Sequence, residues 1–300
     1  MNDHFEDLAG ELRNFQEIAT TLKPSSGEIP KLEGIDIGGI SKPLKELVGG
    51  DHIVYIDFNR RYNLERRIRK AEAAGREEVA ANLRRCRHRA GILLADVSGH
   101  QITDALIAAM LHQAFLSGIY YELDLFGEIT TQLFEYINQR FYRTTSVRKY
   151  LTMIFGEISD EGRFRFISAG HPRPMVYSRE FGRFVKISER RMVSYPPVGM
   201  FPSASAAVDD QVGPGSLGYK QPYTVNEIDL LAEGDILLLY TDGLSEHAGG
   251  KCFPAAFERR LKKVADLPAR EICEVLTQEI LAQAPAEDDI SFVIVKRTAV

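Results

Sequence analysis

Apolar residues follow two different periods along this chain, and the shorter of them predicts β-strands. Alternating or unbroken apolar runs of four to eight residues are typical of strands that are half or fully buried. Such runs occupy 53–58, 92–95, 151–158, 163–167, 174–177, 236–240 and 290–296. The turn sequence Ser159-Asp160-Glu161-Gly162 joins 151–158 to 163–167, which predicts a hairpin and therefore antiparallel pairing.

The longer period predicts helices. Apolar positions three and four residues apart fall in 103–120, 122–141, 253–264 and 269–284. The strands are grouped beside grouped helices rather than alternating with them. This order favours an α+β architecture over a doubly wound parallel sheet.

The N-terminal segment has its own amphipathic pattern. Residues 2–23 carry apolar residues at spacings of three and four, typical of an amphipathic helix or a short coiled coil. It could pack on its own domain or pair with a second chain as a homodimer. Pro24 and Pro30 end the pattern, so we expect a helix and linker over 1–27 and one domain over 28–300.

Two segments inside this domain stand apart. Residues 59–90 contain eleven Arg or Lys and four Glu, a local charge of +7, and we expect one basic helix that is inserted into the domain. It is either a solvated surface helix or a docking surface for an acidic partner. Residues 202–224 are rich in Pro, Ser, Ala and Gly, which predicts a loop or flap.

Composition and charge exclude several classes of protein. With 300 residues, 44% hydrophobic and 26% charged, the chain is long enough for a large buried core and is neither a disulfide scaffold nor a disordered chain. A net charge of −5 argues against a general nucleic-acid binder. Three widely spaced cysteines, an acidic start and the lack of an apolar run of about 20 residues indicate a cytoplasmic protein without a membrane segment.

Acidic residues cluster at the ends of the predicted strands. Asp51 precedes 53–58, Asp96 and Asp242 follow 92–95 and 236–240, and Asp288 with Asp289 precedes 290–296. One such aspartate is usually a turn former. Four strand ends carrying carboxylates instead favour a site for a hard divalent cation such as Mg²⁺ or Mn²⁺, because these ions prefer oxygen ligands.

The motifs around these acids resemble a known family. The ordered series is VGGD at 48–51, ADVSGH at 95–100, AGHPRP at 169–174, PVG at 197–199, EGDILLLYTDGLSE at 233–246 and EDDISFVIV at 287–295. It resembles the SpoIIE-like bacterial metal-dependent serine/threonine protein phosphatases, relatives of the type 2C (PPM) phosphatases, over about residues 30–297. The resemblance implies a four-layer αββα sandwich of two antiparallel sheets flanked by helices, with two divalent cations, Mn²⁺ or Mg²⁺, at one edge.

The resemblance also implies roles for individual residues. Asp51, Asp96, Asp242 and Asp288 match metal ligands, and Val97 matches a backbone carbonyl ligand. Asp289 is a weaker candidate ligand that could instead contact a metal-bound water.

Further residues near these motifs have weaker or competing interpretations. His171 is either a general acid or a structural hydrogen-bonding residue, while His100 and Arg173 are weaker candidates for catalysis and phosphate binding. Asp57, six residues after Asp51, would lie about 20 Å away along a strand and is not expected to serve the same ions.

Two departures from the family pattern concern geometry rather than ligands. Gln101 replaces a glycine that usually follows the ADVSGH motif, and the 59–90 insertion separates Asp51 from Asp96. Neither change removes a carboxylate. These departures put in doubt the exact shape of the loop after Asp96 and the access to the site.

The function implied is hydrolysis of a phosphoserine or phosphothreonine on a regulatory protein, typically a STAS-type antagonist of an anti-sigma factor. A hydroxide that bridges the two cations would attack phosphorus in line. Three alternatives stay open: a catalytically weak or inactive scaffold of the same fold, a hydrolase of a small phosphate ester, and an adaptor that works through its basic segment.

Overall fold

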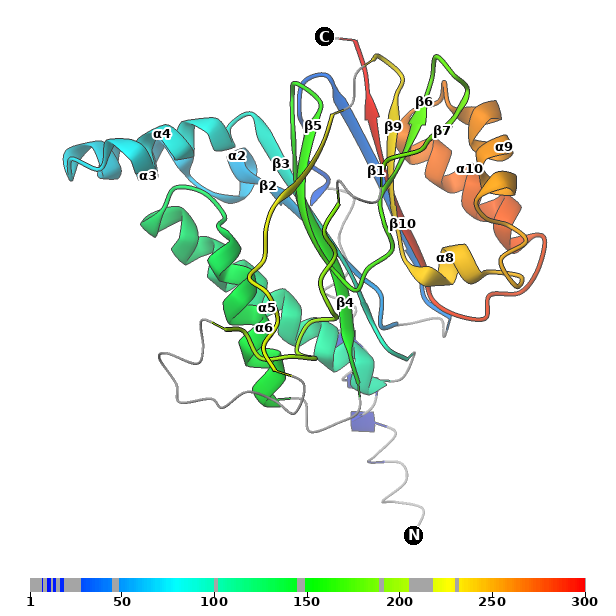
Figure 1. The fold of residues 1–300 in the computed structure, drawn as a ribbon, viewed down its shortest axis with the longest axis horizontal. Helices are drawn as coiled ribbons and strands as arrows, with labels where there is room; N and C mark the ends of the chain where they lie inside the picture. Colours follow the sequence, from blue (N-terminus) through cyan, green and yellow to red (C-terminus); the bar gives the residue numbers. More distant parts are fainter. Residues whose placement is uncertain are drawn as a thin grey trace.

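Two five-stranded antiparallel sheets stack face to face with helices on both outer faces (Figure 1). The computed structural model describes residues 7, 10–11, 13–14, 17–18, 28–44, 49–99, 102–144, 149–188, 192–204, 218–229 and 232–299. Most of the predicted N-terminal helix over 2–23 and most of the predicted flap over 202–224 lie outside the described residues. The four-layer architecture expected from the resemblance is confirmed.

The first sheet has the strand order β1-β10-β9-β6-β7 and the second has the order β2-β3-β4-β5-β8. The strands of the first sheet are β1 (Ile35–Lys42), β6 (Met175–Ser178), β7 (Arg183–Val185), β9 (Ile236–Tyr240) and β10 (Ile290–Arg297). Those of the second are β2 (His52–Asp57), β3 (Arg89–Val97), β4 (Leu151–Ser159), β5 (Arg163–Ala169) and β8 (Asn226–Asp229). All neighbours pair antiparallel, and β4 and β5 form the predicted hairpin.

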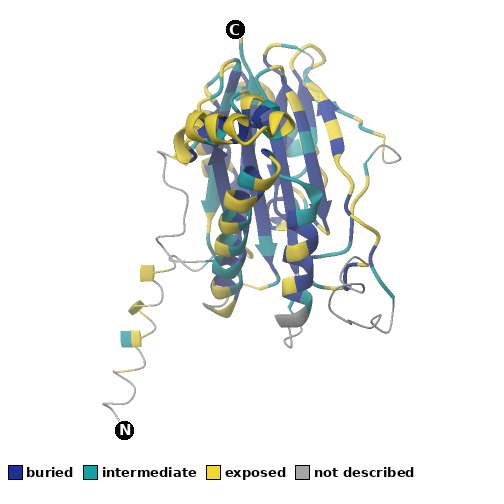
Figure 2. Ribbon diagram, turned by 90° about the vertical axis from the view of Figure 1, so that its left-hand side faces the viewer, coloured by how far each residue is buried: buried dark blue, intermediate teal, exposed yellow. Residues whose placement is uncertain are grey.

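Three hydrophobic layers hold the sheets and helices together. Along β3, Leu93 and Ala95 face the helices on the second sheet, while Ile92 and Leu94 face the first sheet. Because the strand is buried on both faces, its sequence is an unbroken apolar run rather than an alternating one. Figure 2 shows the buried strands inside a shell of half-exposed helices.

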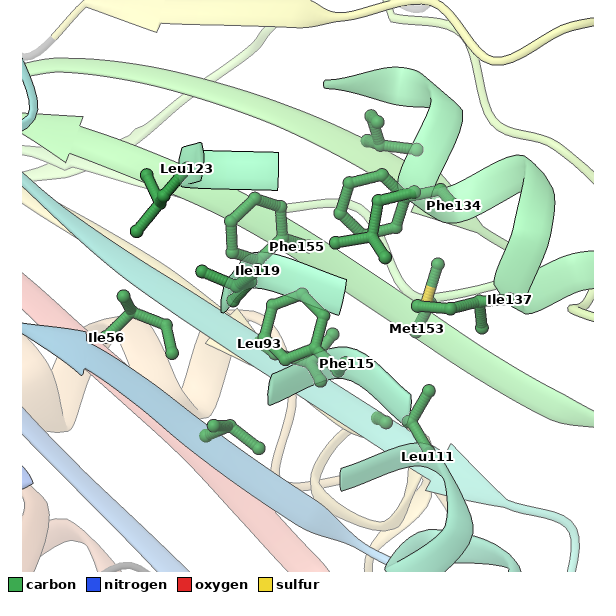
Figure 3. Packing of buried hydrophobic residues seen from close by; sticks show 14 of the residues in the cluster. Ile56, Leu93, Leu111, Phe115, Ile119, Leu123, Phe134, Ile137, Met153 and Phe155 are labelled. Carbon is green, nitrogen blue, oxygen red and sulfur yellow. The ribbon is translucent and has the colours of Figure 1, made fainter. Parts of the chain in front are cut away.

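The helix layers are built from the longer-period segments. The helices are α2 (Phe58–Arg61), α3 (Leu64–Ala73), α4 (Glu77–Cys86), α5 (Ile102–Leu125), α6 (Thr131–Thr144), α8 (Asp242–Glu246), α9 (Ala255–Val264) and α10 (Ala269–Leu281). Helices α5 and α6 cover the second sheet, where Phe115 and Phe134 pack on Phe155 (Figure 3). Helices α9 and α10 pack on the first sheet, so each sheet has one face against helices.

Two sequence expectations about the helices were wrong. The predicted boundary between the helices at 103–120 and 122–141 is misplaced: α5 continues to Leu125 and α6 starts at Thr131, with a turn at Gly127 between them. Gly127 has φ 75°, and a Cβ there would lie 2.3 Å from the carbonyl oxygen of Val79. The apolar residues Leu125 and Phe126 before this turn are exposed, yet they continue the apolar pattern, so periodicity could not locate the break.

The predicted single basic helix is instead a helical hairpin, in which α3 and α4 are separated by Gly75 with φ 69°. Its polar side chains bind the C-terminal end of α5. Arg76 donates to the carbonyl oxygens of Asp124, at 2.9 Å, and Leu125, and Asn82 donates to that of Phe126 at 2.8 Å. The last carbonyls of a helix lack partners within it, so this hairpin caps α5.

Candidate metal centre

The segment before β2 brings Asp51 to the sheet edge. Asp51 is buried, with 9% of its surface exposed, and the Thr241 hydroxyl donates a hydrogen bond of 2.8 Å to its Oδ2. Thr241 follows β9 in the other sheet. The contact therefore joins the two sheets at the position of the predicted ligand.

Asp96, near the end of β3, lies among other carboxylates. Burial is the largest cause that raises its pKa to about 8, followed by the negative charges of Asp242 and Asp288. Burial, and then the charge of Asp96, raises the pKa of Asp51 well above its ordinary value. The four predicted carboxylate ligands thus act on one another electrostatically, although they are up to 237 positions apart in the sequence.

Asp289 supports this site through the backbone. It is 3% exposed, and its carboxylate accepts hydrogen bonds from the N–H groups of Leu44 at 2.7 Å and Gly50 at 2.6 Å. Because both oxygens bind main-chain donors, Asp289 fixes the segment that carries Asp51. A Cβ on Gly49 would lie 2.1 Å from Asp289 Oδ2, so only glycine fits there. That Asp289 also contacts a metal or its water stays a prediction.

The loop after β3 packs against this same segment. The N–H of Val97 donates to the carbonyl of Gly50 at 3.3 Å, and a Cβ on Gly50 would lie 2.5 Å from the carbonyl oxygen of Val97. The predicted backbone ligand therefore lies against the residue that precedes Asp51. The absence of a side chain at Gly50 allows this close approach.

The donor set fits divalent cations of the hard type. Carboxylates that are buried together and raise one another's pKa are offset when a cation binds between them. Within the described ranges, no three His, Cys, Asp or Glu side chains already stand in a coordinating arrangement. The side chains would therefore have to turn toward an ion from positions where they interact with one another.

His171 lies apart from the exposed surface. It is 4% exposed, its Nδ1 is 3.0 Å from the Thr152 hydroxyl oxygen, and burial lowers its pKa to about 3. An imidazole with that pKa is neutral near pH 7 and has no acidic proton to donate readily. The geometry favours the structural interpretation of His171, and its role as a general acid stays a prediction.

The remaining candidates lie elsewhere. Asp57 is at the opposite end of β2, where its Oδ1 accepts from the N–H of Arg60 at 3.0 Å and caps α2. It is 8% exposed and ends β2, and the sequence predicted neither its burial nor its capping role. Arg173 is exposed. His100 and Gln101 lie outside the described residues.

Sequence reasoning missed an ion pair beside this site. Asp104, in the first turn of α5, is 0% exposed and pairs with Lys149, and a Cβ on Gly99 would lie 2.7 Å from Asp104 Oδ2. The pair therefore supports the loop that follows Asp96. An acid placed in the first helical turn directly after a glycine loop was the available signal, but it is indistinguishable from an ordinary dipole-stabilising residue.

Comparison with known proteins gives a consistent result. The family model described as Stage II sporulation protein E (SpoIIE) matches residues 87–298. Phosphoserine phosphatase RsbP of Bacillus subtilis is 29% identical over 69% of this chain and 46% of its own length, and phosphoserine phosphatase RsbU of the same organism is 23% identical over 79% and 55%. The chain thus spans about half the length of these curated relatives.

Among solved structures, the SiaA-PP2C domain of Pseudomonas aeruginosa has a TM-score of 0.62 and 17% identity, with both chains covered completely. At this identity the likeness concerns the fold. It agrees with the two stacked antiparallel sheets described above.

Proposed function

Because this chain belongs to the SpoIIE family, we propose that it is a metal-dependent phosphatase that hydrolyses phosphoserine or phosphothreonine. The observation that carries the proposal is the convergence of Asp51, Asp96, Asp242 and Asp288 at one edge of the sheets, where their charges act on one another. A structural role alone gives no reason to gather four acids at a cost in folding free energy.

We propose that Asp51, Asp96, Asp242 and Asp288, with the carbonyl of Val97, hold two divalent cations, Mn²⁺ or Mg²⁺. Bound there, such ions would lower the pKa of a water molecule and stabilise negative charge on the phosphoryl oxygens.

The residues around the ligands hold them in place. The Thr241 hydroxyl orients the carboxylate of Asp51, and Asp289 fixes the backbone on both sides of Gly49. The Asp104–Lys149 pair supports the loop that carries Asp96. Such support keeps ligands near the productive geometry before substrate arrives.

We propose as substrate a phosphorylated regulatory protein. Two relatives of this chain are named phosphoserine phosphatases, which supports a phosphoserine ester over other phosphate esters. A STAS-type antagonist is the specific candidate that the family resemblance supplies.

Hydrolysis of p-nitrophenyl phosphate and of a phosphoserine peptide, with Mn²⁺ or with a chelator, tests the proposal. Activity should require the metal and fall at least 100-fold in Asp96→Asn and Asp242→Asn. The matched control is Asp229→Asn, because Asp229 is an exposed acid in β8 that pairs with Arg163. Equal hydrolysis rates in the wild type and in all three variants, or full activity in the presence of the chelator, would refute metal-dependent hydrolysis.

A scaffold of the same fold is the second candidate. The observation that favours it is that no coordinating group of three side chains is assembled among the described residues. Calorimetric titration with Mn²⁺ separates the two, since a scaffold should show no saturable binding that Asp96→Asn removes.

A further inference from the structure

A groove of about 840 Å³ runs along β1, the edge strand of the first sheet. Its walls come from residues 29–33, from β1, from His52, Ile53 and Tyr55 of β2, and from the first two turns of α5 and α10. Asp51 and Gly49 lie in the same groove. It is therefore continuous with the candidate metal centre.

The backbone of β1 presents unpaired groups to this groove. Ser291 and Arg297 of β10 exchange main-chain hydrogen bonds with the β9 side, at Thr241 and at Gly234 and Asp235. Because donors alternate along a strand, the residues between them bond to β1, namely to Asp36, Gly38, Ile40 and Lys42 in the observed register.

The N–H and C=O groups of Ile37, Gly39 and Ser41 consequently point away from β10. In the described part of the chain no strand pairs with this edge of β1. At its start, the N–H of Ile35 is taken by the carbonyl of Leu32 at 3.2 Å. Among the described residues, the outward-facing groups of these three residues thus have no strand partner, over a strand of eight residues that spans about 26 Å.

A buried hydroxyl points to the same place. Tyr55 is 4% exposed, and its hydroxyl has no hydrogen-bond partner among the described residues. It lies 2.1 Å from the position that a Cβ on Gly39 would occupy, so it lies against the face of β1 that is turned toward the second sheet, within the lining of the groove. A buried phenol without a partner costs free energy unless a bound group accepts its hydrogen bond.

We propose that this groove binds an extended segment of the protein substrate, which adds a strand to the free edge of β1. Peptides bind exposed sheet edges through main-chain hydrogen bonds, with alternate side chains entering the groove. The apolar walls, with Ala105, Ala108 and Ala109 on one side, fit small or β-branched side chains.

The end of β1 leads directly to the catalytic candidates. The N–H of Leu44, two residues beyond β1, is bound by Asp289. A segment paired with β1 would therefore enter the candidate metal centre at this end, as the residues next to a phosphoserine must. The inference rests on the proposed phosphatase function, and it predicts a substrate segment that is extended rather than helical.

N-methylation of peptide amides tests the pairing directly. The probe is a fluorescein-labelled peptide, Ser-Gly-Val-Thr-Val-Thr-Val-Thr-Lys, made with serine and with phosphoserine. In a paired peptide strand, the N–H groups of every second residue face β1 and those of the residues between them face away. Methylating the amides that face β1 should raise the Kd, measured by fluorescence anisotropy, at least tenfold. Methylating the amides that face away should change the Kd less than twofold. Equal effects of the two patterns, or no binding to the wild type below 1 mM, would overturn the proposal.

Two variants test the protein side. Ser41→Pro removes one open N–H without touching the β1–β10 ladder, and Ala109→Phe fills the groove from the opposite wall; each should raise the peptide Kd about fivefold or more. Ala114→Phe, farther along α5 and outside this groove, is the control. Unchanged peptide affinity in Ala109→Phe contradicts the groove assignment even if Ser41→Pro does not fold.

Binding of the unphosphorylated peptide does not depend on catalysis. Hydrolysis of p-nitrophenyl phosphate, which is too small to reach β1, should be unchanged in both groove variants. Suppose that the wild type binds the peptide with the predicted dependence on amide methylation but, with Mn²⁺, hydrolyses neither p-nitrophenyl phosphate nor the phosphoserine peptide. The proposed function then fails and the groove assignment stands. If the wild type hydrolyses both esters but its peptide Kd does not depend on which amides are methylated, only the groove assignment fails.

Discussion

Gly49→Ala should weaken both the fold and the candidate metal centre, because the added methyl group meets the carboxylate of Asp289. The new Cβ would lie 2.1 Å from Oδ2 and 2.6 Å from Oδ1, where real Cβ contacts stay beyond 3.0 Å. The carboxylate or the Gly49 segment must therefore move by about 1 Å. A shift of that size lengthens hydrogen bonds of 2.6 and 2.7 Å beyond the usual limit.

The energy follows from these two bonds. A hydrogen bond to a charged group contributes about 1.5–3 kcal/mol, so losing both costs at most about 3–6 kcal/mol. Relaxation of the segment reduces the cost, and we expect the free energy of unfolding to fall by about 2–4 kcal/mol. Because Asp51 follows Gly50 directly, the affinity for Mn²⁺ should fall at least tenfold.

Urea denaturation of the metal-free protein, followed by circular dichroism because the chain has no tryptophan, measures the stability. Calorimetry measures the Mn²⁺ affinity. Gly10→Ala is the matched control, since a Cβ on Gly10 would have no atom of the described residues within 4 Å. If Gly49→Ala and Gly10→Ala have the same urea midpoint and the same Mn²⁺ affinity, the supporting role assigned to Asp289 is wrong.

Three further predictions concern charged groups. An acid whose pKa is raised in the folded state stabilises the fold only while it is protonated, so the metal-free protein should lose stability as pH rises from about 4 to about 8. Urea titrations at several pH values measure this loss, and Asp96→Asn should make it smaller. A pH dependence of Asp96→Asn equal to that of the wild type would contradict the prediction. Arg76→Ala should lower the melting temperature, at a cost of about 1–2 kcal/mol in stability, because the C-terminal end of α5 loses its cap. Arg69→Ala, at an exposed position, should leave the melting temperature unchanged. Equal melting temperatures of the two variants in thermal scans would argue against the cap. Lys220→Met should lower the free energy of unfolding in urea by about 3–5 kcal/mol, because it leaves the Glu135 carboxylate buried without its cation. Lys220→Met combined with Glu135→Gln should recover part of that free energy. No recovery would mean that the two charges are not coupled.

The sequence predicted those parts of the site that depend on local pattern. Asp51, Asp96 and Asp242 lie at the ends of buried strands, because a strand that leaves the core must end in a polar turn. The four acidic strand ends already favoured one shared cation site, and the family resemblance then assigned roles to the individual residues. Asp289 could not be assigned from pattern, because its partners, the N–H groups of Leu44 and Gly50, lie more than 230 positions away in the sequence.

The basic hairpin shows the same limit. Its composition is visible in the sequence, but whether its charges face solvent, a partner or the chain itself depends on where the end of α5 lies. Arg76 and Arg67 bind that end, so part of the positive charge is used within the molecule. Neither of the two sequence interpretations, a solvated helix or a docking surface, included this cap.

By itself, then, the sequence missed the strands β1, β7 and β8. It determined the other seven strands of the described residues, most of the helices, the antiparallel hairpin and the acidic strand ends. These depend on side-chain periodicity and turn chemistry, which act over a few residues. Only the tertiary structure decided that His171 is buried, that Asp289 holds backbone rather than standing free, and that one edge of β1 has no strand partner among the described residues, beside the candidate metal centre. Those features depend on which distant segments meet, and burial and electrostatics are set by that packing rather than by any local pattern.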